Sequence, residues 1–158
     1  MANDTALRQH LVSLLTEGNA HVTFEASFEN LPAELCGQTP AGADHSLWEL
    51  LEHLRITQWD ILDFSRNPEY KEREWPKDYW PETATPPTET AWDDSIAAFL
   101  TDRKVLCALV ADESNDLYAK IPWGSGQTLL REALLTADHN AYHLGQVILV
   151  RRLLGAWK

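Results

Sequence analysis

The chain is poor in basic residues. It has 13 lysines and arginines against 24 aspartates and glutamates, so its formal net charge is −11 over 158 residues. Binding to a phosphate backbone or to an anionic membrane surface needs clustered basic side chains. The sequence therefore predicts neither a nucleic-acid partner nor a membrane partner.

Cysteines and long apolar runs are also scarce. Cys36 and Cys107 are too few for a disulfide framework or a zinc ribbon, so we expect each to be a loop or core thiol. No stretch approaches the roughly 20 apolar residues of a membrane span, and the N-terminus lacks a basic segment followed by an apolar run. These absences make a cytoplasmic protein the default expectation.

Alternating polar and apolar residues are rare too, whereas apolar residues at helical spacing are frequent. Helices are predicted at 4–17, 46–65, 88–111 and 128–154, with a shorter helical piece at 21–31. Asn3 or Asp4 can cap the first helix and Thr128 the last. Ser46 and Glu49 have the spacing of a capping box, which marks the start of the second long helix.

The composition, 44% hydrophobic and 23% charged, predicts one globular domain over residues 1–158. Four long helices with some long connectors predict an all-α fold, an antiparallel four-helix bundle. A strand-containing α+β fold is the alternative. The connector at 66–87 holds two tryptophans, two tyrosines and five prolines, and we expect it to pack over one end of the bundle. It can form a pocket wall or a dimer contact there.

His139 and His143 lie four residues apart in the last predicted helix. Four residues advance about 6 Å and turn about 400°, so both imidazoles leave the same helix face on successive turns. This geometry suits chelation of one metal ion. A pair alone does not complete a site, so a further ligand must come from another helix.

The polar residues of this helix fall within a band of roughly 80° when the residues are placed on a helical wheel. The band contains Glu132, Thr136, His139, His143 and Gln146. Such a stripe can simply face water. However, the same stripe continues into apolar residues at 150, 153 and 154, and Arg131, Asp138 and Arg152 provide a more ordinary exposed face. Both readings stay open at this point.

His53 is the best candidate for the third ligand. It lies at the edge of the apolar stripe of the second long helix, a position that points into the groove between two helices. His21 shares the face of Phe24 and Phe28 and is predicted to be a pocket residue near the site. His45 is predicted to be a loop residue and His10 to face solvent.

Three neutral imidazoles suit Zn²⁺ or Ni²⁺ best, with Fe²⁺ and Mn²⁺ as alternatives, and three protein ligands leave coordination positions open. Glu132, Gln146 and His21 are the candidates for orienting a ligand or a bound water. The sequence has no His-Glu-x-x-His arrangement, which excludes a metalloprotease with a built-in base.

The residues resemble the DinB-like superfamily of metal-binding four-helix bundles in two places. One is the segment 46–54, SLWELLEHL, and the other is 137–146, ADHNAYHLGQ, followed by RRLLG at 151–155. The resemblance implies that His53, His139 and His143 bind a divalent metal and that the protein is a homodimer. Some relatives activate a low-molecular-weight thiol as S-transferases or as a thiol-dependent isomerase, and many have no known activity.

Two hypotheses follow for the function. The first is a metal-dependent enzyme, a transferase or hydrolase, that activates a thiol or water for attack on a small electrophilic substrate. The second is a non-enzymatic bundle that binds metal or a small ligand for structure or sensing. A basic cluster that could hold a thiol cofactor's carboxylates would favour the first, and the nearest candidates are Arg55, Arg66, Lys71 and Arg73.

Overall fold

The computed structural model describes residues 4–157, and within that range the chain is all-helical. The α-helices are α1 (Thr5–Thr16), α2 (Phe24–Phe28), α3 (Leu47–Arg66), α4 (Ala91–Ala111) and α5 (Leu129–Leu153), with 3-10 turns η1 (Ala33–Leu35) and η2 (Lys77–Tyr79). Extended pairing in this range is limited to one isolated bridge between Lys120 and Thr128. The all-α prediction is therefore confirmed, and the α+β alternative is excluded for the described residues.

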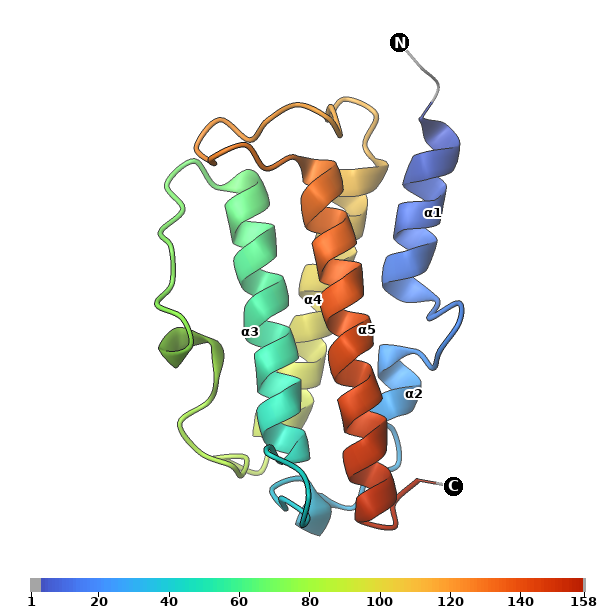
Figure 1. Cartoon of the computed structure of the whole chain (residues 1–158), viewed down its shortest axis with the longest axis vertical. Coiled ribbons are helices and arrows are strands. Elements are labelled where there is room, and N and C mark those ends of the chain that lie inside the picture. The colour runs from blue at the N-terminus through green and yellow to red at the C-terminus, as the bar shows by residue number, and fades with distance from the viewer. Residues whose placement is uncertain (1–3, 158) are drawn as a thin grey trace.

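The four long helices do not simply alternate in direction. α3 and α4 run the same way, whereas α1 and α5 run the opposite way (Figure 1). The connector between α3 and α4 therefore has to return the chain along the whole length of the bundle, and it does so on the outer side of α3 (Figure 1). We expected this segment over one end of the bundle; its hydrogen bonds instead hold it along the flank of α3.

Local capping explains where α3 and α5 begin. Ser46 accepts a hydrogen bond from the Glu49 amide, and the Glu49 carboxylate accepts one from the Ser46 amide, which completes the predicted capping box. Thr128 accepts from the Arg131 amide in the same way. These caps satisfy amides that would otherwise be orphaned, so both site-bearing helices have fixed starting points.

Two of the predicted elements differ from the structure. The helical piece expected at 21–31 is only the five residues of α2, because the Thr23 side chain caps it and accepts from the Ala26 amide. The Asp4 side chain makes no capping bond to α1 and pairs with Arg8 instead. The other proposed cap, Asn3, lies outside the described residues.

The interior consists of two apolar clusters with a polar layer between them. One cluster contains Leu47, Leu51, Leu54, Phe24, Phe99 and Val147, and the other contains Leu11, Leu62, Leu106, Val110 and Ala133. Between them Gln58, fully buried, donates to the Phe99 carbonyl at 2.8 Å and accepts from Asn140 at 3.2 Å. This layer ties α3, α4 and α5 together by hydrogen bonds as well as by apolar contact. No helix in the described range is both long and apolar enough to cross a membrane.

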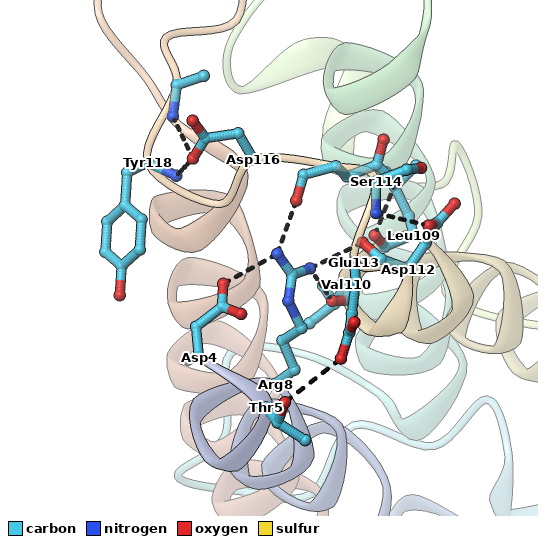
Figure 2. A network of polar contacts seen from close by, with 12 residues as sticks. Asp4, Thr5, Arg8, Leu109, Val110, Asp112, Glu113, Ser114, Asp116 and Tyr118 are labelled. Carbon is cyan, nitrogen blue, oxygen red and sulfur yellow. Dashed lines mark hydrogen bonds and ion pairs between the residues drawn. The ribbon is translucent and has the colours of Figure 1, made fainter. Parts of the chain in front are cut away.

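A buried arginine fastens α1 to the rest of the bundle. Arg8 is 5% exposed and donates to the carbonyls of Val110, Asp112 and Asn115, at 2.7, 2.9 and 2.7 Å (Figure 2). The Asp4 carboxylate lies 2.9 Å from the same guanidinium. These carbonyls belong to the end of α4 and the turn after it, where helix carbonyls lack intrahelical partners. One side chain thus caps α4 from another helix.

We predict that Arg8→Met lowers the free energy of unfolding by about 3 kcal/mol, because three carbonyls lose their donor while methionine keeps the apolar stem. Urea denaturation followed by circular dichroism measures the change. Arg152→Met is the matched control, since Arg152 is exposed on α5. Equal losses in the two variants would contradict the capping role of Arg8.

Candidate metal centre

The three histidines predicted to form a site come together between α3 and α5. Their ligand nitrogens all lie within 4.8 Å of one another. His53 comes from α3, and His139 and His143 come from successive turns of α5. His53 and His143 are 2% and 8% exposed. The polar stripe of α5 therefore faces the interior of the bundle. The alternative interpretation, that this stripe faces water, is excluded.

Hydrogen bonds at Nδ1 orient two of the three rings. His53 Nδ1 lies 2.8 Å from the Tyr79 carbonyl, which can only accept, so this nitrogen carries the proton. His143 Nδ1 lies 2.7 Å from Gln146 Oε1 and donates to it in the same way. In a neutral imidazole the other nitrogen then carries a lone pair. In both rings Nε2 therefore carries the lone pair that can ligate a metal, and Nδ1–H is held by a hydrogen bond, as is usual for metal-binding histidines.

The third ring faces the first at short range. His139 Nε2 lies 3.1 Å from His53 Nε2, and His139 Nδ1 is buried without a hydrogen-bond partner. Two nitrogens of neutral rings at this distance need a proton or a cation between their lone pairs. The donor set therefore fits a divalent transition metal. That these residues bind one remains a prediction.

Burial keeps the triad neutral. It lowers the pKa of His139 to about 3 and of His143 to about 4, with the neighbouring imidazoles adding to the effect. Burial also lowers the pKa of His53. A histidine must be deprotonated to ligate a metal. All three are in that form at neutral pH.

The long connector supplies contacts that sequence reasoning did not assign. Trp80 stacks on His53, with ring centroids 3.9 Å apart and planes 2° apart, and also stacks on His45 at 4.0 Å. Tyr79 provides the carbonyl that holds His53. His45 is a loop residue as expected, but its ring belongs to this aromatic stack. The density of aromatic residues in the connector was the available signal, and it predicted a pocket wall without identifying which residue touches which histidine.

Two exposed aromatic rings lie on the solvent side of the triad. Tyr142 is 64% exposed, with its ring centroid 4.9 Å from that of His143. Trp75 is 68% exposed and lies 6.4 Å from His53 by the same measure. Both rings are therefore accessible to a molecule in solvent close to the triad.

Only one of the three residues proposed to orient the ligands contacts the triad. Gln146 bonds His143, as described above. Glu132 instead bonds Arg131, and it stands seven residues from His139, about 10 Å along the helix. His21 is exposed, precedes α2, and its ring contacts only the neighbouring Val22 carbonyl among the hydrogen bonds found for it. The structure thus brings Gln146 to the triad and leaves Glu132 and His21 away from it; His10 is exposed, as predicted.

The sequence of the chain also matches a known protein family. The sequence model of the DinB superfamily matches residues 18–147 of the chain. This range covers α2, α3, α4 and most of α5, and it includes all three histidines of the triad. Searches of curated proteins and of solved structures returned no match.

We predict that protein purified without chelator carries about one equivalent of a divalent transition metal, as a three-ligand site requires. Alanine at His53, His139 or His143 should remove most of it, whereas His10→Ala should keep it. Elemental analysis by mass spectrometry measures the metal. A content below about a tenth of an equivalent, unchanged on adding Zn²⁺ or Ni²⁺, would contradict the assignment.

A second prediction concerns the metal-free protein in acid. The unfolded chain binds protons at histidine near pH 6.5, whereas the folded protein has a pKa of about 3 at His139 and about 4 at His143. The neutral histidines therefore make their full contribution to the free energy of unfolding above pH 6.5, and this contribution falls as the pH drops below 6.5. We expect a loss of at least ~1 kcal/mol between pH 7 and pH 5. Urea denaturation at the two pH values measures it.

The variant His139→Gln isolates this effect from that of the buried carboxyls, whose raised pKa acts in the opposite direction. It should lose less stability between the two pH values than the parent protein. His10→Gln, at an exposed position, should behave as the parent does. The same acid loss in all three proteins would show that the triad is not its source.

Proposed function

The chain belongs to the DinB superfamily, and from that premise we propose that it is a metal-dependent enzyme that transfers a thiol or water to a small electrophilic substrate. The observation that carries the proposal is the convergence of three neutral imidazoles from two helices, two of them fixed through Nδ1. Three protein ligands are the usual number in a catalytic zinc site, where a further position is left for substrate.

His53, His139 and His143 would hold a divalent ion, which would supply the Lewis acidity that makes a thiol or water nucleophilic at neutral pH. The protein's own groups do the rest. Tyr79 and Gln146 fix the two Nδ1–H groups and so set the direction of each Nε2. Trp80 covers one face of His53 and keeps water from it. Trp75 and Tyr142 offer apolar surface on the exposed side, which suits an electrophile with an aromatic or apolar body.

A non-enzymatic role is the second candidate, and a specific observation favours it. The basic residues best placed to hold the carboxylates of a thiol cofactor already have acidic partners. Arg55 makes two hydrogen bonds to Glu52, at 2.7 and 2.8 Å, and Arg73 lies 3.7 Å from Asp60. A metal that joins α3 to α5 would also stabilise the bundle without any reaction. Activity measurements separate the two roles.

We predict that the metal-loaded protein consumes a low-molecular-weight thiol in the presence of a chloronitroaromatic electrophile, and that chelation abolishes the reaction. Gln146→Leu should bind the metal about 10- to 100-fold more weakly, because His143 loses the acceptor that orients it. Gln9→Leu, at an exposed site on α1, serves as the matched control. Absorbance of the arylated thiol measures turnover, and a competition titration with a chromogenic chelator measures affinity.

The outcome against the enzyme is a protein that binds metal, gains thermal stability from it, and turns over none of a panel of thiols, electrophiles and hydrolysable esters. That result would favour the non-enzymatic role. If Gln146→Leu bound the metal as tightly as the parent, the orienting role of Gln146 would be wrong even where the protein is active.

A further inference from the structure

A cleft opens between the last turns of α3 and the first turns of α5. It has a volume of about 440 Å³ and lies between α3, the start of the connector, the loop at 121–127 and the first turns of α5. Its walls include Phe64, Tyr70, Trp123, Asp60 and Glu132. The volume is within the range of small-molecule sites, roughly 300–1,000 Å³.

Two buried carboxylates stand in the walls of this cleft. Glu132 is 1% exposed and Asp60 is 7% exposed. Glu132 Oε1 accepts from Arg131 at 2.8 Å, but Oε2 accepts no hydrogen bond from any residue in the range 4–157. This oxygen is not among the fully buried polar atoms that lack a partner, so it is open to the solvent of the cleft and can accept from a ligand there. A ligand with N–H groups would supply the donor.

Asp60 is held in a fixed orientation. Tyr79 donates to Oδ2 at 2.8 Å and Tyr70 donates to Oδ1 at 3.1 Å, while Arg73 lies 3.7 Å away. Burial raises the pKa of Asp60 and that of Glu132, and the Asp60 charge raises the latter further. The positive charges nearby thus do not fully compensate the two buried carboxylates. A cation between them would.

Aromatic rings form a further part of the cleft wall. Trp123 donates its indole N–H to the Phe64 carbonyl at 2.7 Å, and the Phe64 and Tyr70 rings meet edge to face with centroids 5.1 Å apart. Aromatic faces attract cations and also cover the apolar part of a ligand. Buried carboxylates together with aromatic rings disfavour an anion and favour a positively charged organic molecule.

We propose that this cleft binds a small organic cation with N–H groups, such as a primary alkylammonium or an amidinium, between Asp60, Glu132 and the aromatic wall. A bare transition metal suits it less well, because the one group of three or more closely spaced metal-ligating side chains in the described range is the histidine triad. The proposal does not depend on the reaction at the triad.

The test is isothermal titration calorimetry of the full chain with 2-phenylethylammonium at neutral pH. The neutral 2-phenylethanol and the anionic 3-phenylpropanoate are matched ligands of nearly the same shape. We expect one cation per chain, with both matched ligands at least about tenfold weaker, since charge-assisted hydrogen bonds are the stronger ones. Tetramethylammonium, which has no N–H, should also bind at least about tenfold more weakly.

Variants locate the site. Glu132→Gln and Asp60→Asn keep the shape of the wall and should each weaken the cation about tenfold or more. Asp138→Asn, at an exposed position on α5, should change affinity less than about twofold. His139→Ala should leave affinity unchanged, which excludes an amine bound through a metal at the triad. Far-UV circular dichroism confirms that each variant folds.

Nuclear magnetic resonance gives a second readout, independent of how well the carboxyl variants fold. The indole N–H of Trp123 should shift on titration of the parent protein with 2-phenylethylammonium. Equal affinity for the cation and the neutral alcohol would overturn the proposal, and so would binding that vanishes in His139→Ala or persists unchanged in Glu132→Gln. Absence of any saturable binding of the cation at millimolar concentration would overturn it as well.

Discussion

The geometry of the candidate metal centre depends on two hydrogen bonds at imidazole Nδ1. The bond of His53 to the Tyr79 carbonyl and that of His143 to Gln146 determine which nitrogen of each ring stays free. Without them either ring could present either nitrogen to a metal ion. The acceptors come from the connector and from α5 itself, so the triad needs the whole of the α3–α5 contact to be in place.

This arrangement puts polar groups in a layer that the apolar clusters enclose on both sides. Gln58 and Asn140 fill part of the layer with hydrogen bonds to each other and to the α4 backbone. A buried polar layer stabilises one relative position of the helices only, because any sliding of α5 along α3 would leave these groups without partners. The register of the two helices, and with it the approach of His139 to His53, is fixed by that requirement.

Sequence reasoning succeeded where the signal is local. The capping box of Ser46 and Glu49 predicted the start of α3, and the four-residue spacing of His139 and His143 predicted that both rings would lie on one face. His53 could be chosen because its place at the edge of an apolar stripe marks a groove between helices. Each of these inferences uses residues within one or two turns, where helix geometry alone decides the outcome.

The failures come from information that a helical wheel discards. Glu132 shares the angular band of the histidines, but the wheel ignores the distance along the axis, and seven residues place it about 10 Å away. His21 has the right spacing to Phe24 and Phe28 only if the helix extends back to it, and the cap at Thr23 starts α2 after it. The Tyr79 carbonyl leaves no trace in the sequence, because every residue has one.

The same seven-residue interval relates the two sites on the α3–α5 groove. Asp60 follows His53 by seven residues on α3, and Glu132 precedes His139 by seven on α5, which runs in the opposite direction (Figure 1). Seven residues are nearly two full helical turns, so both pairs lie on the same face of their helices. The histidine triad and the carboxylate cleft therefore form two levels of one groove, about two turns apart. Tyr79 joins the levels, since its carbonyl holds His53 and its hydroxyl donates to Asp60.

The two levels nevertheless differ in chemistry because their buried groups differ in charge. Burial favours the neutral form of a histidine and so exposes nitrogen lone pairs, which suit a transition metal. A buried carboxylate with one oxygen open to the cleft favours a donor with positive charge instead. Tyr79 is thus common to both levels, but the groups that would contact a ligand differ: imidazole nitrogens at one level and carboxylate oxygens at the other.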